Sequence, residues 1–184
     1  YDRSIADGYT LKIMREDIET SYREKLTAVQ EKLETLVQKK EVSKHQIIEH
    51  DSYVDELLRY IITDLVRFRK IQGDDSLGGM MICETSAQAE KLHQHFEQIR
   101  QSVCPDTPLK AGLILHDYED KETRRQLVKD FKRNMTIDVL IVYNMLLTGF
   151  DAPRLKRLYF GRKLKDHNLL QEIGRASCRE RVYV

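Results

Sequence analysis

A short polar turn, Thr148-Gly149-Phe150-Asp151, follows a strand-like apolar run at residues 137–143 and carries residue types suited to binding a ligand. Glycine lets the backbone approach a ligand, threonine offers a hydroxyl, and the carboxylate can accept from a ribose hydroxyl or a cationic side chain. Parallel α/β proteins bind ligands beyond the carboxyl ends of their strands. The turn therefore indicates a phosphate- or nucleotide-binding position, with the alternative that Asp151 only caps a following helix.

A second hydroxyl-bearing turn, Thr85-Ser86, follows the apolar run at residues 80–84. Hydroxyl groups and the free N–H groups of a helix start suit phosphate oxygens, so these two residues are candidates for contacting phosphate. The alternative interpretation is simple capping of the helix that follows.

A basic segment follows the first turn. Residues 152–171 contain six basic side chains and one acidic side chain, a net charge of +5: Arg154, Lys156, Arg157, Arg162, Lys163 and Lys165 against Asp166. Such a segment is suited to a phosphate backbone, and a solvated surface is the alternative. Over the whole sequence, 31 basic residues balance 30 acidic ones, so the global charge indicates no particular partner.

Several kinds of site are absent from the sequence. It has no G-x-x-x-x-G-K-[ST] phosphate loop and no paired strand carboxylates for a metal, so no catalytic residue is predicted in this chain. The three cysteines, Cys83, Cys104 and Cys178, lack metal-ligand spacing, and no metal site is predicted. No apolar run approaches 18 residues, which predicts a cytoplasmic protein without a membrane span.

The elements that position these turns alternate between strand and helix. The predicted order is strand 80–84, helix 87–100, strand 109–115, helix 121–133, strand 137–143 and strand 157–160. This alternation predicts an α/β fold with a parallel sheet and flanking helices. A long amphipathic helix over residues 10–40 and a second helix capped by Asp51 or Ser52 come first, then a flexible break at residues 73–79. The long helix is either a coiled-coil arm or packed on its own domain, and the second interpretation is favoured.

Three strings carry a family resemblance. Residues 146–171, LLTGFDAPRLKRLYFGRKLKDHNLLQ, resemble motif V and the lead-in to motif VI of the second RecA-like domain in the motor (restriction) subunit of type I restriction-modification enzymes, a superfamily-two helicase branch. Residues 79–96 resemble its motif IV strand and helix, and residues 1–26 resemble the connector into that domain. The resemblance implies a helical connector at 1–78 and a RecA-like helicase domain at 79–171.

The resemblance also implies roles for individual residues. Gly149, Asp151 and Gln171 are expected to face nucleotide, whereas the expected DNA contacts are Thr85, Ser86, Thr148, Arg154 and Lys156. ATP and Mg²⁺ are expected to be held mostly by a first RecA-like domain outside this chain, so the isolated chain is expected to bind neither and to be inactive. In the intact type I site-specific deoxyribonuclease, the implied partners are duplex DNA, that first domain, and the methylase and specificity subunits.

The two ends of the sequence favour a fragment. The sequence starts at Tyr1 instead of methionine, and residues 173–182, IGRASCRERV, resemble a translated sequencing adapter. Residues 172–184 are therefore expected to be a non-native tail outside the fold. Two alternatives for the function remain at this point. One is another superfamily-two helicase domain, and the other is a non-enzymatic α/β interaction module with a coiled-coil arm.

Overall fold

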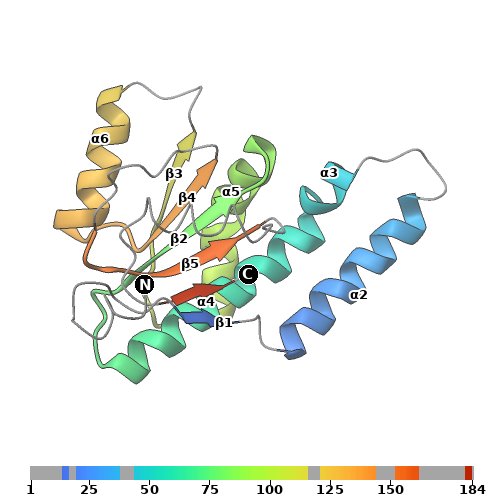
Figure 1. Cartoon of the computed structure of the whole chain (residues 1–184), viewed down its shortest axis with the longest axis horizontal. Helices are drawn as coiled ribbons and strands as arrows, with labels where there is room; N and C mark the ends of the chain where they lie inside the picture. Colours follow the sequence, from blue (N-terminus) through green and yellow to red (C-terminus); the bar gives the residue numbers. More distant parts are fainter. Residues whose placement is uncertain are drawn as a thin grey trace, which may run out of the picture.

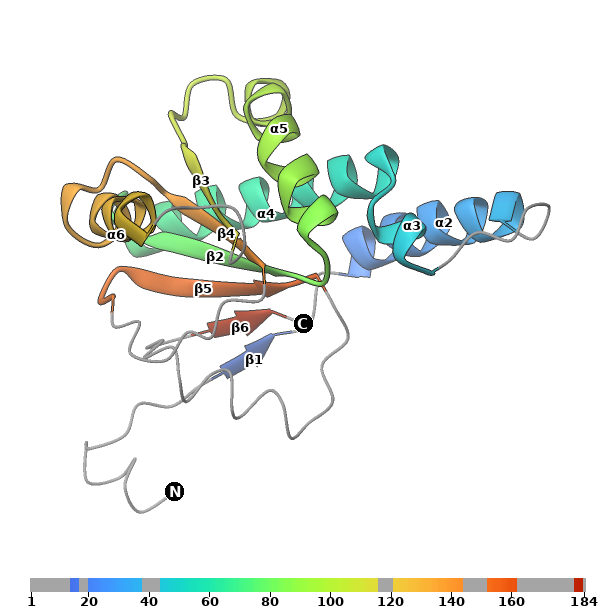
Figure 2. The ribbon, with the colours of Figure 1, turned by 90° about the horizontal axis from the view of Figure 1, so that it is seen from above.

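The structure is a computed structural model that describes residues 14–16, 20–37, 44–115, 121–143, 152–161 and 181–183. Six parallel strands form one sheet in the order β1-β6-β5-β2-β4-β3 (Figure 2). The strands are β1 (Met14–Glu16), β2 (Gly78–Cys83), β3 (Ala111–Leu115), β4 (Val139–Tyr143), β5 (Leu155–Phe160) and β6 (Arg181–Tyr183). Because all strands run in one direction, the sheet has a carboxyl edge and an amino edge with different chemistry.

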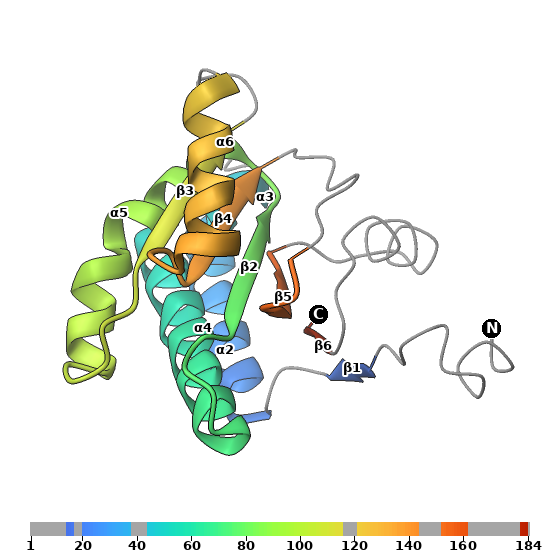
Figure 3. The ribbon, with the colours of Figure 1, turned by 90° about the vertical axis from the view of Figure 1, so that its left-hand side faces the viewer.

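Helices cover both faces of this sheet. They are α2 (Thr20–Val37), α3 (Lys44–Ile48), α4 (Asp51–Gln72), α5 (Ser86–Val103), α6 (Lys121–Lys129) and the π-helical turn η1 (Asp130–Asn134). Helices α2, α4 and α5 gather on one side of the strands (Figure 3), while α6 and η1 pack on the other. The predicted parallel α/β fold with flanking helices is confirmed.

Strand β2 lies at the centre of the sheet. All six of its residues are buried, as expected for a strand covered by helices on both faces. Its alternate side chains divide between two apolar clusters: Met81 and Cys83 face α4 and α5, whereas Met80 and Ile82 face η1. Burial raises the pKa of the Cys83 thiol, so this cysteine acts as a small apolar side chain of the core.

The long helix predicted over residues 10–40 is shorter in the structure. Residues 14–16 form β1, which pairs with β6, and the helix begins only at Thr20. Helix α2 packs against α4, with Leu26 buried and the rings of Tyr22 and Tyr60 at a centroid distance of 5.3 Å. The preference for packing on its own domain over a coiled-coil arm is therefore supported.

Helix α4 belongs to the same core as the sheet, although the sequence placed it in a separate connector. Its buried side chains, among them Val54, Leu58 and Leu65, lie in one cluster with residues of α5, β4 and β5. The helix is capped by His50, whose ring accepts from the Ser52 N–H, and not by Asp51 or Ser52 as predicted. It ends at Gly73, whose φ of 64° is readily adopted only without a Cβ.

Part of the C-terminal segment belongs to the sheet, contrary to the prediction. The structure places Arg181–Tyr183 in the sheet as β6, between β5 and β1, although residues 172–184 were expected to lie outside the fold. The outer edge of β5 offers unpaired backbone groups, and a short Arg-Val-Tyr segment is suited to add to such an edge.

Two kinds of feature are absent from the described residues. No helix among them is both long and apolar enough to cross a membrane. These residues also contain no group of three or more histidine, cysteine, aspartate or glutamate side chains that could hold a metal ion.

Candidate nucleic-acid interface

Thr85 lies at the carboxyl edge of the sheet, two residues after the end of β2, and caps α5. Its backbone is extended, with φ −134° and ψ 157°, and its hydroxyl accepts from the Gln88 N–H at 3.1 Å. The same hydroxyl donates to Glu49 Oε1 at 2.6 Å. An α-helix has no internal acceptors for its first N–H groups, so those of Ser86 and Ala87 remain for an external acceptor. This arrangement is suited to a phosphate oxygen.

The side chain of Gln88 in α5 connects this helix to the end of β2 at the carboxyl edge. Its side chain is fully buried, and its Oε1 accepts from the Glu84 N–H at 2.9 Å. Gly161, which follows β5, lies so close that a Cβ there would be 2.7 Å from Met81 Cε and 3.0 Å from Gln88 Oε1. Within the described part of the chain, Gln88 Nε2 has no hydrogen-bond partner. The edge therefore contains a buried amide donor beside the start of α5.

One acidic side chain contacts the Thr85 cap, and two more lie on the segments next to it in the sequence. Glu49 contacts the cap directly. Burial raises the pKa of Tyr53, and the negative charge of Glu84 raises it further. Asp51 forms an ion pair with Lys91 of α5 at 2.6 Å, and this hydrogen bond lowers the pKa of Asp51. An incoming phosphate would therefore meet Glu49 at the position with the best hydrogen-bond donors.

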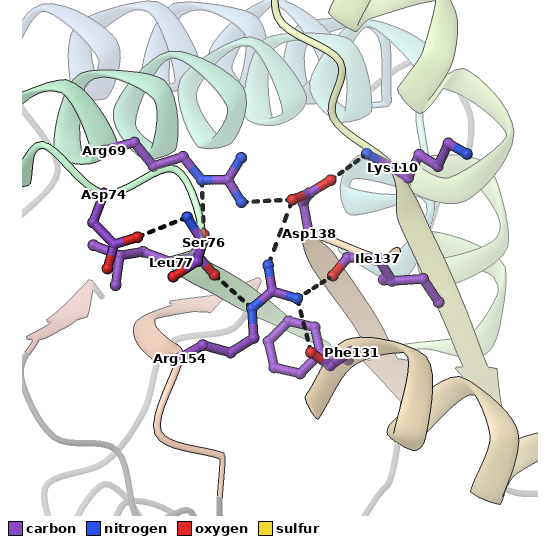
Figure 4. Close-up of polar contacts among 9 residues, drawn as sticks. All are labelled: Arg69, Asp74, Ser76, Leu77, Lys110, Phe131, Ile137, Asp138 and Arg154. Atoms are coloured by element: carbon purple, nitrogen blue, oxygen red, sulfur yellow. Dashed lines mark hydrogen bonds and ion pairs between the residues drawn. The ribbon is translucent and has the colours of Figure 1, made fainter. Parts of the chain in front are cut away.

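The predicted DNA contact at Arg154 needs correction. Its side chain is 5% exposed, and its guanidinium donates to three backbone carbonyls, those of Ser76, Phe131 and Ile137, at 2.6 to 2.8 Å (Figure 4). It also lies over the Phe131 ring, 4.9 Å from the centroid. Burial lowers the pKa of this group, an effect that the Asp138 carboxylate opposes. Arg154 is a structural residue in this fold because its donors are already used inside it.

Asp138 joins Arg154 to Arg69 in what we term the amino-edge cluster. The Asp138 carboxylate accepts from Arg69 Nη2 at 2.6 Å and from the Lys110 N–H at 2.9 Å, and it lies 3.5 Å from Arg154 Nη2. Arg69 Nε donates to the Leu77 carbonyl at 2.7 Å. Together with the Arg154 bond to Ser76, these contacts fix a segment that the sequence suggested to be a flexible break (Figure 4).

Arg157 is also removed from the predicted basic surface. Its side chain is 4% exposed and lies on the Phe68 ring at 3.8 Å from the centroid, with Nε 3.4 Å from the Asp64 carboxylate. The Tyr159 hydroxyl donates to the same carboxylate at 2.7 Å. The basic segment at 152–171 is therefore not one continuous surface, because β5 carries part of it into the core.

Lys156 lies at the amino edge, far from Thr85. Gly78 pairs with Leu155 and Gly79 with Arg157, so Lys156 is the extra residue at a β-bulge near the start of β5. It is half-buried, whereas Thr85 follows the last residue of the neighbouring strand. Five residues of strand correspond to about 17 Å, so the structure does not bring Lys156 together with Thr85 and Ser86.

The remaining predicted site residues, Thr148, Gly149, Asp151 and Gln171, lie outside the described residues. Sequence reasoning missed Glu49 and Gln88 at the carboxyl edge. Neither residue stands in a recognisable motif, and Glu49 is 36 positions from the threonine that it contacts. A polar residue at the third position of a helix is a common partner of the preceding turn, and this was the one available signal for Gln88.

A comparison with protein families matches the chain to a known group. The family described as type I restriction enzyme subunit R domain 3 matches residues 83–182, which is more than half of the chain. The chain belongs to this family. The resemblance noted in the sequence is thereby confirmed, and the match includes most of the segment that had been set aside as a tail.

Proteins related to this subunit R chain carry consistent names. The putative type I restriction enzyme MjaVIIP endonuclease subunit of Methanocaldococcus jannaschii is 34% identical over 94 residues, covering 51% of the chain and 9% of that protein. The type I restriction enzyme HindI endonuclease subunit of Haemophilus influenzae is 38% identical over 72 residues, covering 39% of the chain and 6% of that protein. The chain therefore spans only a small part of the length of these relatives.

Solved helicase structures share the fold of this subunit R domain. Domain 2 of the DEAD-box helicase Mss116p, bound to an RNA duplex, superposes with a TM-score of 0.52 at 14% identity, covering 71% of the chain and 50% of that structure. The helicase Lhr of Mycobacterium smegmatis, bound to single-stranded DNA and AMP-PNP, gives 0.51 at 15% identity, covering 70% and 16%. At this identity the likeness shows the fold alone, a RecA-like helicase domain.

Proposed function

We propose that this chain is part of the ATP-dependent DNA translocase of a type I restriction endonuclease. In this role it supplies one wall of the ATP cleft and a set of contacts to the DNA backbone. The observation that carries the proposal is the start of α5 at the carboxyl edge, where Thr85 caps the helix and the N–H groups of Ser86 and Ala87 have no internal acceptor. The relatives named as endonuclease subunits support this role.

The ATP site is proposed to be shared with a first RecA-like domain. Gly149, Asp151 and Gln171 of this chain would face the nucleotide, and Thr148 would join Thr85 and Ser86 on the DNA. The sequence has no phosphate loop, so the first domain would hold most of the ATP and Mg²⁺. The chain by itself is accordingly proposed to be inactive as an ATPase, and the intact subunit to act with methylase and specificity subunits.

In this proposal, nucleotide-dependent closure of the cleft moves the carboxyl edge relative to the first domain. The N–H groups of Ser86 and Ala87 would hold one phosphate during this movement and release it when the cleft opens. Arg154 has no part in this grip because its guanidinium is buried, and Lys156 lies at the other edge of the sheet. The rival interaction module is disfavoured because α2 packs against α4 of its own chain.

A pair of variants at Thr85 tests the DNA contact in the complete subunit assembled with its methylase and specificity partners. Asparagine and aspartate both cap helices well, but only asparagine can also donate to the Glu49 carboxylate. Thr85→Asn and Thr85→Asp are therefore compared in a Glu49→Gln background, where the two should fold alike. Only aspartate adds a negative charge facing the phosphate. The lost charge-assisted contact is worth roughly 1.5–3 kcal/mol, so DNA-stimulated ATP hydrolysis and translocation should fall roughly 10- to 150-fold for Thr85→Asp.

The matched control is Lys156→Gln, which removes a charge at the amino edge and should leave both activities unchanged. Equal activity of the asparagine and aspartate variants, at equal thermal stability, would leave Thr85 as a helix cap without a role in DNA binding.

A further inference from the structure

Four basic residues form a regular line on α6 and η1, which we term the α6 stripe. Lys121, Arg125, Lys129 and Arg133 recur at every fourth position, and all four side chains are exposed. The opposite side of the same segment contacts the sheet through Leu127, Val128 and the fully buried Phe131. The stripe therefore faces away from the core.

The stripe opposes the stability of its own helix. Like charges four positions apart repel by about 0.2–0.5 kcal/mol per pair, and the stripe contains three such pairs. Lys121 also lies in the first turn, where the helix dipole disfavours a cation. Glu122 lies 3.6 Å from Arg125, and Asp130 accepts from Gln126 and Asn134. A helix face that is only solvated more often alternates the two signs of charge.

The stripe extends from the carboxyl edge of the sheet to the amino edge. Helix α6 follows the end of β3 and leads through η1 toward the start of β4, so it runs from the carboxyl edge to the amino edge (Figure 1). Twelve helical residues rise about 18 Å, which matches about five base pairs along a DNA strand. The Lys121 end lies nearest the edge where Thr85 caps α5.

We propose that the α6 stripe is a second DNA-binding surface, which contacts the phosphate backbone of duplex DNA outside the cleft. It would hold the duplex along the side of the domain by charge alone, independent of base sequence and of nucleotide. The choice of duplex DNA among polyanions rests on the proposed function.

The composition of the stripe favours DNA over an acidic protein partner. Protein interfaces take much of their energy from aromatic, arginine and aliphatic anchors that fill apolar pockets. No large apolar side chain is exposed anywhere in residues 121–133, all of which the structure describes. A phosphate backbone requires only cations at regular intervals, which is what the stripe provides.

The test measures duplex binding of the full chain at several salt concentrations, with a fluorescently labelled duplex of arbitrary sequence. The variant changes Lys121, Arg125, Lys129 and Arg133 to glutamine, which forms helices well. Each lost phosphate contact should flatten the slope of log K against log salt by about 0.9, so the slope should flatten by about 3.6 for four contacts. Affinity at low salt should fall about tenfold or more.

The matched control changes four exposed lysines on other surfaces to glutamine: Lys25, Lys32, Lys70 and Lys110. It lowers the net charge equally, so it should reduce affinity much less if the contacts are local. The inference is overturned if both variants show the same slope. It is also overturned if the stripe variant keeps its DNA affinity and instead loses binding to the methylase and specificity subunits.

The two proposals can fail separately. If the stripe variant binds DNA as well as the wild type does while Thr85→Asp blocks translocation, the stripe proposal is wrong and the proposed function stands. A stripe variant with reduced DNA affinity beside a fully active Thr85→Asp variant would retain the stripe and remove the DNA contact at the carboxyl edge. No binding by the wild-type chain at low salt would overturn the stripe, while the Thr85 test would still decide the function.

Discussion

The hydroxyl of Thr85 is shared between two elements: it accepts from the Gln88 N–H of α5 and donates its only proton to Glu49 Oε1 at 2.6 Å. Glu49 lies in the short connection between α3 and α4. A carboxylate thus sits at the helix start that we propose for a DNA phosphate, and the two anions would compete for it.

Replacement of Glu49 by glutamine should strengthen duplex binding. The new amide oxygen can still accept from Thr85, but the side chain no longer repels a phosphate, a change worth about 1 kcal/mol or roughly fivefold in affinity. Thermal stability should fall slightly, because an anion near a helix start stabilises the helix by about 0.3–1 kcal/mol. Glu97→Gln, at the far end of α5, is the control and should leave affinity near the wild-type value. Weaker DNA binding by the Glu49→Gln variant would contradict this competition.

Replacement of Arg154 by methionine should strongly destabilise the fold. The change leaves the carbonyls of Ser76, Phe131 and Ile137 without their donor, and it removes one cation from buried Asp138. Loss of one partner from a buried ionic network costs about 3–5 kcal/mol in free energy of unfolding, measured by urea denaturation.

Two further variants test whether the lost hydrogen bonds cause this loss of stability. Arg154→Lys should recover only part of the loss because an ammonium cannot reproduce the planar set of donors. Lys156→Met should change stability by less than about 0.5 kcal/mol, since Lys156 is paired with no buried side chain in the part of the chain that the structure describes. A small effect of Arg154→Met would return this residue to the list of DNA contacts.

The fold should lose stability at alkaline pH partly through Tyr159. Burial raises the pKa of this phenol well above its ordinary value, and the neighbouring Asp64 carboxylate raises it further. Above pH 10 the unfolded chain therefore releases a proton that the folded chain retains, so the free energy of unfolding falls as pH rises. The stabilisation is fully present below pH 10.

Tyr159→Phe should reduce that alkaline dependence by up to about 1.4 kcal/mol per pH unit. At neutral pH it should cost about 1 kcal/mol, because the 2.7 Å hydrogen bond to Asp64 is lost. Thermal melts between neutral and alkaline pH measure both effects, and parallel curves for the variant and the wild type would exclude Tyr159 as a source.

Asp151→Asn, in an intact motor subunit, separates two roles for a residue outside the described part of the chain. A carboxylate that faces ribose or a cation loses a bond worth roughly 1.5–3 kcal/mol, which lowers coupled ATP use and translocation roughly 10- to 150-fold. Asparagine caps a helix as well as aspartate does, so a capping role leaves the motor nearly unchanged. Rates compared at equal thermal stability decide between the roles.

The sequence predicted four of the six strands, β2 to β5, because their signals are local. The run at residues 137–143 is continuously apolar apart from Asp138, and the helix after Thr85 shows a clear apolar face, so β4 and α5 were found within a few residues of their ends. The sequence did not decide which residue of the Thr85-Ser86 turn caps α5, because two adjacent hydroxyl residues offer equivalent caps, and the structure shows that Thr85 is the cap.

The amino-edge cluster could not be predicted in this way. Arg69 and Asp138 are 69 positions apart, and nothing in the spacing of either residue indicates its partner. Arg154 belongs to a run of basic residues, which suggests an exposed surface, yet its side chain is buried just before the start of β5. Whether a charge is buried depends on the path of the strand through the sheet, which the local sequence does not specify.

The amino-edge cluster also has a mechanical consequence. Arg69 belongs to the last turn of α4, Asp138 immediately precedes β4, and Arg154 immediately precedes β5, so three separate segments are joined at one carboxylate. The end of α4 is therefore fixed to the residues that precede two strands of the sheet, without a hinge between them. Helix and sheet should rotate as one rigid body, so that a force generated at one edge of the domain is transmitted to the other edge.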